Sequence, residues 1–176
     1  LKAMLRRNTV LQDLDLSGDD LGSAGFAEVA SALYRNTSIQ GLDVSLNDLD
    51  DRAAANTVKE LLRRNKTITR LNMAHNTFGS SAVVVARIIA DGFRNNTTLK
   101  ELNLSSCELN NQSISILAEG LGQQKRGLQD LNLSANQITC FGLRALMGNA
   151  TAALSTVTHL NLRSNHLYDE GASFLA

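Results

Sequence analysis

The apolar and polar positions of the chain follow a pattern that recurs six times, L-x-x-L-x-L-x-x-(N/C/D)-x-L, with other apolar residues in some leucine places. Successive copies start 28, 29, 31, 29 and 29 residues apart, so the period is nearly constant. The copies begin at Leu11, Ile39, Ile68, Leu99, Leu128 and Val157. A period of this length indicates one strand–helix unit that is stacked repeatedly, because a single unit cannot bury its own apolar face.

Each copy begins with a segment in which apolar and polar residues alternate. In the fifth copy, Leu131 and Leu133 fall on one face of such a segment, whereas Asp130 and Asn132 fall on the other. This alternation is typical of a strand with one buried face. We therefore expect six short strands, which the stacking of the copies would join into one parallel sheet.

The second part of each copy has apolar residues at helical spacing. In the first copy, Phe26, Val29, Ala30 and Leu33 recur at i, i+3, i+4 and i+7. This spacing predicts a helix that buries one face. We expect several of these helices to end at asparagine, because asparagine tolerates the left-handed conformation that stops a helix. The asparagines concerned are Asn36, Asn65 and Asn95.

The repeated motif resembles the leucine-rich repeat, and its period and helix resemble the ribonuclease-inhibitor class of that family. The class motif Leu-x-x-x-Gly-Ala-x-x-Leu is present between Leu167 and Leu175. The second copy departs from it, with Ala53 in the glycine place, and the third copy has two extra residues, which we expect in its helical part. The resemblance implies an α/β fold, a right-handed β-α solenoid shaped like a horseshoe, with a concave parallel sheet and convex helices.

The resemblance covers residues 11–176, in about six repeats. Residues 1–10 resemble the end of a preceding repeat's helix, since M-L-R-R-N-T at 4–9 parallels L-L-R-R-N-K at 61–66. We therefore expect residues 1–176 to form a single leucine-rich-repeat domain, and the chain to be a piece of a longer protein.

One position of the motif carries Asn, Cys or Asp in every copy. Metal binding is conceivable for these residue types, but one residue per copy does not make a cluster, and the resemblance implies a ladder that bonds the backbone of the turns. The members are Asp19, Asn47, Asn76, Cys107, Asn136 and Asn165. Asp19 has no amide hydrogen to donate, so we expect a weaker ladder in the first copy unless its carboxylate accepts backbone N–H groups.

The strand residues that face away from the core form the default binding surface of such a solenoid. One of their columns is Asp or Asn in all six copies, which is typical of the repeat and says little about specificity. Seven positions outside the consensus are better candidates for binding a partner: Arg70, His75, Lys100, Glu101, Asp130, His159 and Arg163. Acidic residues gather toward the N-terminal end of this face and basic ones toward its middle and C-terminal end, a gradient that would orient a partner.

Arginines recur near the ends of the expected helices. They are Arg7, Arg35, Arg64, Arg94 and Arg126. Two interpretations remain open: a stripe that binds phosphate or nucleic acid, or cations that stabilise helix C-termini by roughly 0.3–1 kcal/mol each. We favour the second, because the net charge is zero and no aromatic residues interleave with the arginines.

Composition narrows the class of protein further. The 17 basic and 17 acidic residues balance, so neither nucleic acid nor an acidic membrane is expected as a partner. Two cysteines, Cys107 and Cys140, are compatible with a reducing compartment, and we expect a cytoplasmic protein. Cys140 opens an expected helix, where the dipole would lower its pKa, although we favour a packing role for it.

No combination of residues indicates catalysis. No Ser/His/Asp or Cys/His set has a spacing that would bring its members together in stacked repeats. Glycine-rich phosphate motifs are also absent. We therefore expect no enzyme activity and no cofactor, and we predict a recognition scaffold that binds a protein partner through its concave face. Two alternatives stay open, a regulator of a small GTPase of the GTPase-activating type and a cytoskeletal binder that resembles actin-capping proteins.

Overall fold

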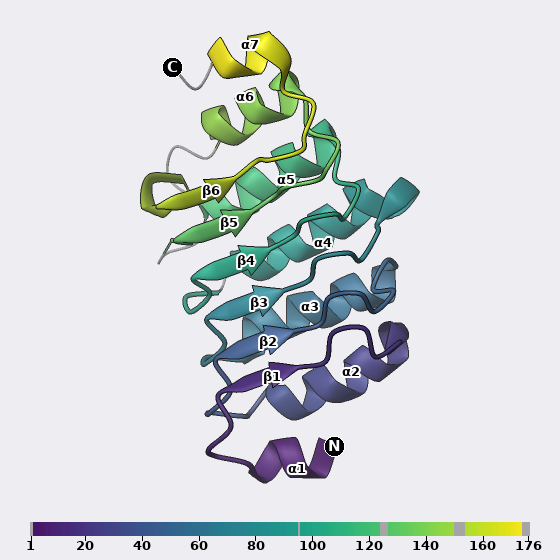
Figure 1. Ribbon diagram of the computed structural model, residues 1–176. Helices are drawn as coiled ribbons and strands as arrows, with labels where there is room; N and C mark the ends of the chain where they lie inside the picture. Colours follow the sequence, from purple (N-terminus) through teal and green to yellow (C-terminus); the bar gives the residue numbers. More distant parts are fainter. Residues whose placement is uncertain (1, 95, 124–126, 150–153, 174–176) are drawn as a thin grey trace.

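Strands and helices alternate along the whole chain (Figure 1). The computed structural model describes residues 2–94, 96–123, 127–149 and 154–173. The strands are β1 (Asp13–Asp15), β2 (Gly41–Asp43), β3 (Arg70–Asn72), β4 (Glu101–Asn103), β5 (Asp130–Asn132) and β6 (His159–Asn161). The α-helices are α1 (Lys2–Arg7), α2 (Gly22–Leu33), α3 (Arg52–Arg64), α4 (Ala82–Phe93), α5 (Asn111–Gly122), α6 (Cys140–Asn149) and α7 (Tyr168–Ser173). Two short 3-10 helices are η1 (Gly79–Ser81) and η2 (Leu154–Thr156).

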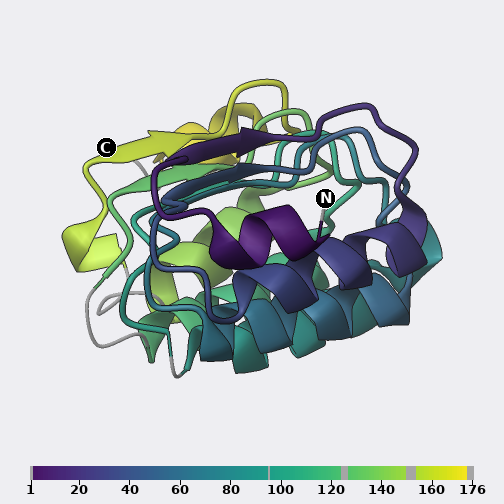
Figure 2. The same cartoon turned by 90° about the horizontal axis from the view of Figure 1, so that it is seen from below.

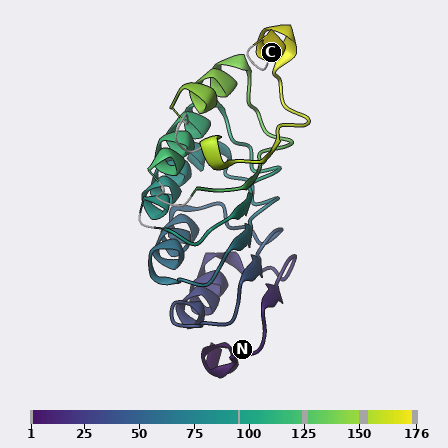
Figure 3. The same ribbon diagram turned by 90° about the vertical axis from the view of Figure 1, so that its left-hand side faces the viewer.

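The six strands form one parallel sheet in chain order, and each strand pairs with the next at a constant register. Seen along the stack, the strands form one layer and the helices another (Figure 2). In side view the helix layer lies on the outside of the curve and the strand layer on the inside (Figure 3). The expected α/β solenoid is thus confirmed.

The apolar core lies between the two layers. The central residue of each strand points into it, and Leu42, Leu71, Leu102 and Leu131 are buried. The helical face expected in the first copy is also buried, with Phe26 among its members. Because burial of a large apolar side chain contributes about 1.5–3 kcal/mol, these repeated contacts hold neighbouring copies together.

The strands are parallel, so all of them start on one side of the sheet and end on the other. We call the side formed by the C-terminal ends of the strands, where each strand passes into a turn, the turn edge. We call the side formed by their N-terminal ends, where each helix ends and the next strand begins, the helix-end edge. In the third copy the turn edge also carries η1, which lies between Phe78 and α4 and lengthens this copy before its helix.

A ladder of buried asparagines ties the turns together along the turn edge. Asn76 donates from Nδ2 to the carbonyl oxygens of Val44 (3.0 Å) and Met73 (2.9 Å). Its Oδ1 accepts from the backbone N–H groups of Asn47 (3.1 Å) and Leu49 (3.0 Å). Corresponding bonds to the preceding turn are made by Asn47, Asn136 and Asn165. Each asparagine therefore serves the turn of the copy before its own.

Asp19, in the first copy, has no preceding turn in the ladder to bond. It is exposed, and within the described residues its side chain makes no hydrogen bond. The turn nevertheless keeps its shape: Gly18 has φ +69°, close to the +54° to +58° of the equivalent residues in the other five copies. Asn47 Oδ1 accepts from the backbone N–H groups of Asp19 (3.2 Å) and Leu21 (3.0 Å). The prediction of a weaker ladder in the first copy was wrong, because the next copy supplies the acceptor.

Cys107 takes the asparagine place in the fourth copy. Its Sγ donates to the Met73 carbonyl oxygen (3.4 Å), and burial raises the pKa of its thiol to about 12. A thiol lacks the amide oxygen, so the backbone N–H of Phe78 donates to the main-chain carbonyl of Cys107 instead (3.1 Å). The substitution keeps a donor and replaces the lost acceptor with backbone, as expected of a structural residue.

A second ladder of buried asparagines, which was not expected from the sequence, follows the helix-end edge. Its members are Asn36, Asn65 and Asn96. Asn65 Nδ2 donates to the Leu33 carbonyl oxygen at the end of α2 (2.7 Å), and its Oδ1 accepts from the N–H groups of Thr67 and Ile68. One side chain thus caps the preceding helix and shapes the start of its own strand.

The way these helices end also differs from expectation. Asn65 has φ −75° and ψ 140°, which is extended backbone and not the left-handed conformation. The prediction that this asparagine ends the helix in a left-handed conformation was therefore wrong. Asn65 contributes through the hydrogen bonds of its side chain, and its extended backbone places the side chain where it can make them. Asn95, named in the same prediction, lies outside the described residues.

Candidate functional site

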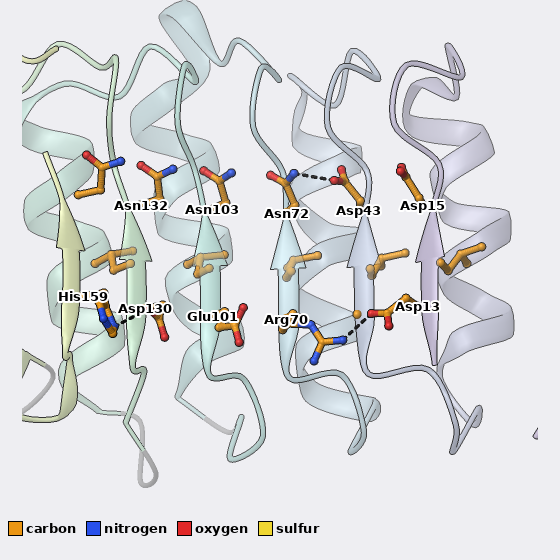
Figure 4. Close-up of a pocket in the computed structure, with 17 residues that line it drawn as sticks. Asp13, Asp15, Asp43, Arg70, Asn72, Glu101, Asn103, Asp130, Asn132 and His159 are labelled. Carbon is orange, nitrogen blue, oxygen red and sulfur yellow. Dashed lines mark hydrogen bonds and ion pairs between the residues drawn. The ribbon is translucent and has the colours of Figure 1, made fainter. Parts of the chain in front are cut away.

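The inner face of the sheet is hollowed into a groove of about 480 Å³ that crosses all six strands (Figure 4). The first residue of each strand forms one column along it, and the third residue forms another. The first column is Asp13, Gly41, Arg70, Glu101, Asp130 and His159. The second column is Asp15, Asp43, Asn72, Asn103, Asn132 and Asn161. Each groove side chain therefore stands at a position set by the strand register.

The second column has a structural task in every copy. Its side-chain oxygen accepts the backbone N–H two residues further on, as Asn103 Oδ1 does from Ser105 (3.0 Å) and Asp15 Oδ1 from Ser17 (2.9 Å). The bond from Ser17 holds the pKa of Asp15 below its ordinary value. These bonds fix the turn that follows each strand, which gives a physical reason for a column that is Asp or Asn throughout.

The first column carries an ion pair that spans a whole strand. The Arg70 guanidinium on β3 donates to the Asp13 carboxylate on β1 (Figure 4). The two groups meet beside Gly41 of β2, which lies between them. A Cβ atom on residue 41 would clash with the Asp13 carboxylate and lie 3.0 Å from Arg70 Nη2. The glycine therefore leaves the space that lets two residues on non-adjacent strands meet.

The other half of the first column holds a second pair. His159 Nδ1 lies 2.9 Å from Asp130 Oδ1 on the neighbouring strand; the His159 side chain is largely exposed and that of Asp130 is partly exposed. Between the two pairs stands Glu101, which is exposed and has no side-chain partner among the described residues. Glu101 is thus the free charge at the middle of the groove.

The groove is acidic as a whole. Five of its lining residues are carboxylic acids, against one arginine and one histidine: Asp13, Asp15, Asp43, Glu101 and Asp130, with Arg70 and His159. The expected gradient from an acidic to a basic end does not hold inside the groove, because carboxylates occur in both halves. A chain of zero net charge therefore presents a negative inner surface.

Four of the seven predicted binding residues lie together in the first column, and three lie elsewhere. The four are Arg70, Glu101, Asp130 and His159. Lys100 precedes β4 and points toward the helix-end edge, where its Nζ lies 3.4 Å from the Gly127 carbonyl oxygen. His75, with φ +58°, and Arg163 are exposed residues of the turn edge and do not line the groove.

The Cys140 thiol does not have the electrostatics of an activated nucleophile. Its Sγ donates to Glu170 Oε2 (3.3 Å), and this bond to a carboxylate is the main cause that raises its pKa. A nearby negative charge disfavours the thiolate more than the start of α6 favours it. The interpretation with a lowered pKa was wrong, and the packing interpretation fits this buried residue.

Across the described ranges, no group of three or more His, Cys, Asp or Glu side chains is arranged to hold a metal ion. In the same part of the chain, no helix combines the length and apolarity needed to cross a bilayer.

The sequence model of the Leucine Rich repeat family matches residues 35–55, 64–84, 95–118 and 153–176. These segments make up about half of the chain and include strands of several copies. The chain belongs to the leucine-rich repeat family.

Relatives place these leucine-rich repeats in the ribonuclease-inhibitor-like class. The "NACHT, LRR and PYD domains-containing protein 12" of Mus musculus is 32% identical over 99% of the chain and 19% of that protein. The ribonuclease inhibitor of Sus scrofa is 29% identical over 83% of the chain and 31% of the inhibitor. The chain therefore spans less than a third of the length of either relative.

Two solved structures share the fold of these leucine-rich repeats. Leiomodin-1 actin-binding site 2 superposes with a TM-score of 0.72 at 17% identity, covering 88% of the chain and 87% of that structure. The tropomodulin C-terminal domain of Caenorhabditis elegans superposes with a TM-score of 0.63 at 13% identity, covering 88% and 91%. At these identities the likeness concerns the fold alone.

Gly41 is part of the site in these leucine-rich repeats but was not among the residues predicted from the sequence. Gly41 stands where the other copies have Asp, Arg, Glu, Asp and His, and this absence of a side chain in the column was the available signal. What it allows, the contact between Asp13 and Arg70, depends on two strands that are not neighbours.

Proposed function

We propose that the chain is a recognition module that binds a basic surface of a protein partner in its concave groove. The observation that carries the proposal is the excess of carboxylates in the groove, with Glu101 unpaired at its middle. Complementary charge speeds encounter and orients the partner, and mismatched charge rejects others. Arg70 contributes less to binding a partner than the sequence suggested, because it already forms an ion pair with Asp13.

The rigidity of the groove supports binding over catalysis. Its second column is held by bonds to the backbone, and its first column contains two side-chain pairs. Side chains that are already ordered lose less conformational freedom on binding. We propose no enzyme activity and no cofactor, and a protein rather than a nucleic acid as the partner, because phosphates would be repelled by this surface.

The wider context is also a proposal. We propose that residues 1–176 form one domain of a longer protein, which the length of the relatives supports. A cytoplasmic location is supported by the two cysteines, which are both free and buried. The fold likeness to leiomodin-1 actin-binding site 2 makes actin a candidate to test by co-sedimentation, but the low identity carries no residue-level argument. No observation favours a role in GTPase regulation.

A peptide probe tests the proposed function directly. We expect a labelled peptide that alternates lysine and serine to bind the chain, and fluorescence anisotropy to show weaker binding as salt is raised. Replacing Glu101→Gln and Asp130→Asn removes two groove charges. At about 1.5- to 5-fold per exposed ion pair, the double variant should bind roughly 2- to 30-fold more weakly.

The matched control is Glu119→Gln with Asp91→Asn, which removes two exposed charges from the helix layer. This control should bind the lysine peptide within about twofold of wild type. Equal losses in the two variants would show a dependence on net charge only, and unchanged binding by the groove variant would exclude the groove as the site.

A further inference from the structure

The helix-end edge carries a second hollow, far from the groove. It is about 720 Å³ in volume and lies where α1, α2 and α3 end. Its lining residues are Arg6, Ser31, Ala32, Tyr34, Arg35 and Arg64. We call it the basic cleft, because three of its six lining residues are arginines and none is acidic.

The basic cleft contains two arginines of the series identified in the sequence, and Arg6 takes the place expected for Arg7. Arg35 and Arg64 line it, but α1 contributes Arg6 and not Arg7. Arg94 lies further along the edge, 3.7 Å from Asp91, and Arg126 lies outside the described residues. The arginines that converge are thus those of the first three helices.

The charge of the basic cleft is only partly compensated. Arg64 Nε donates to Glu60 (2.8 Å), which also accepts from Arg63, and the Arg64 guanidinium lies 5.1 Å from the centre of the Tyr34 ring. Arg6 and Arg35 make no hydrogen bond or ion pair within the described residues. Two unpaired positive charges therefore remain.

Glu28 is the carboxylate to consider beside Arg6. Lys2 Nζ lies 2.6 Å from it, and this bond is the main cause that lowers the pKa of Glu28, with a smaller effect from the charge of Arg6. Glu28 does not line the cleft. Since Lys2 already holds this carboxylate, it leaves Arg6 without a partner of its own.

Direct hydrogen bonds to the helix ends do not account for this convergence. The carbonyl oxygens of Leu5, Leu33 and Leu62 at the helix ends are already bonded by buried amides. The donors are Nδ2 of Asn36, Asn65 and Asn96, at 2.7, 2.7 and 2.8 Å. The arginines of the basic cleft donate to none of these oxygens in the described structure. Arg6 and Arg35 are therefore free to contact a ligand, whereas Arg64 is partly held by Glu60.

We propose that the basic cleft binds an acidic segment of a protein in extended conformation. Packed helices lie about 8–10 Å apart, so arginines from three successive helix ends form a row at roughly that spacing. A chain in the extended polyproline II conformation has three residues per turn and rises about 3.1 Å per residue, so carboxylates at every third residue lie on one face, roughly 9 Å apart, and match the row. Arg6 and Arg35 each offer a planar fork to one carboxylate, and the Arg64 guanidinium, which Glu60 binds through Nε, adds its positive charge.

A nucleic acid fits this site less well. Binding to single strands relies on aromatic rings on which bases stack, and the ring that lines the basic cleft is Tyr34, which is half-buried and covered by Arg64. The site is separate from the concave groove and opposite in charge. One partner could thus occupy both, or two partners could bind independently.

The test uses a fluorescein-labelled peptide of about twelve residues with glutamate at every third position and serine elsewhere, together with its glutamine counterpart. Anisotropy at about 50 mM and 300 mM NaCl reports affinity and its salt dependence. We expect the glutamate peptide to bind and the glutamine peptide to bind at least about tenfold more weakly. Arg6→Gln with Arg35→Gln should weaken the glutamate peptide by about 2- to 30-fold.

The matched control is Arg52→Gln with Arg144→Gln, two exposed arginines outside the basic cleft. It should bind the glutamate peptide within about twofold of wild type, and circular dichroism should show both variants folded. Wild-type affinity in the cleft variant, or equal losses in cleft and control variants, would overturn the proposal. So would tighter binding of a single-stranded oligonucleotide than of the peptide. Because the lysine peptide reports the groove, failure of one site leaves the result for the other intact.

Discussion

At the scale of residues, the same side chain performs different tasks according to its burial. Buried asparagines make several hydrogen bonds each at the turn edge, and Asn76, with five, is the clearest case. Half-buried asparagines in the groove, such as Asn103, accept one local bond from the backbone. Because an unmet backbone group is costly only away from water, the first kind governs stability and the second mainly shapes a turn.

Replacing Asn76→Ala tests this difference. The change leaves the N–H groups of Asn47 and Leu49 and the carbonyl of Val44 without their side-chain partner in a buried place. We expect the free energy of unfolding to fall by about 2–5 kcal/mol, measured by urea denaturation. Asn103→Ala is the comparison and should cost less than about 1 kcal/mol. Similar costs for both would mean that water replaces the ladder bonds.

At the scale of elements, neighbouring helices approach so closely that glycine is required between them. A Cβ atom on Gly120 of α5 would lie 2.6 Å from Ala90 Cβ and 2.8 Å from the Ala90 carbonyl oxygen of α4. Gly92 meets Leu62 of α3 in a similar way. Because the helices lie on the outside of the curve, their narrow spacing keeps the curvature of the solenoid low and the groove open.

Replacing Gly120→Ala should push α4 and α5 apart. Overpacking of this kind costs about 1–3 kcal/mol, which exceeds the helix propensity that alanine gains. Gly148→Ala in α6 is the control, because a Cβ there meets nothing within 4 Å. We expect thermal denaturation to show a lower midpoint for the first variant and an equal or higher one for the second. A stable Gly120 variant would show that the helix layer yields easily.

The start of α3 makes stability depend on pH. Asp51 accepts from the Ala54 N–H (2.7 Å) and from the Ser23 hydroxyl (2.6 Å), and these bonds, that from Ser23 first, lower its pKa below 3.8. Since the folded-state pKa is the lower one, the stabilisation is complete above the unfolded pKa and is lost as pH falls through the folded value. The Asp51 cap therefore stabilises the start of α3 at neutral pH, where its carboxylate is ionised.

Replacing Asp51→Ala should therefore cost about 1 kcal/mol at pH 7. The difference from wild type should shrink as pH falls below about 4, in urea denaturation at several pH values. Asp50→Ala removes a neighbouring exposed carboxylate that has no side-chain bond among the described residues, and should change little. A constant cost for Asp51→Ala at all pH values would mean that packing, not ionisation, matters there.

At the scale of the whole molecule, zero net charge conceals two surfaces of opposite sign. The concave groove is acidic and the basic cleft at the helix-end edge is basic. Equivalent positions of successive repeats lie next to one another in the solenoid. When such a position carries the same charge in several repeats, the charges form a stripe along the molecule. The molecule can thus present two charged sites without a long-range net field.

The solenoid also predicts how stability is distributed. Each repeat contacts its neighbours, so inner repeats have two partners. Accordingly Leu131 is buried in β5, whereas Leu160 at the same position of β6 is only half-buried. In the isolated chain of residues 1–176, we expect amide hydrogen exchange in β6 to be at least about tenfold faster than in β4, as measured by mass spectrometry. Equal protection of the two strands would indicate that all six repeats unfold as one unit.

Much of the fold could be predicted from residues in sequence order. The alternation around Leu131 and Leu133 predicts a strand, and the spacing of Phe26, Val29 and Leu33 predicts a buried helix face, because both patterns are local periods. The candidate site was harder to predict from the sequence. His75 and Arg163 share the non-consensus signal of the groove residues but lie on the turn edge, and position in the motif alone did not separate them.

The sequence by itself determined the repeat, its period, the buried faces and the column to which each polar residue belongs, since these depend on neighbours along the chain. Only the tertiary structure decided which residues meet across copies: Arg70 with Asp13 over Gly41, and the cleft arginines in one hollow. It also decided that each ladder asparagine serves the preceding turn. The reason is physical: charge and hydrogen bonds act through space, between groups that the stacking of repeats brings within a few ångströms.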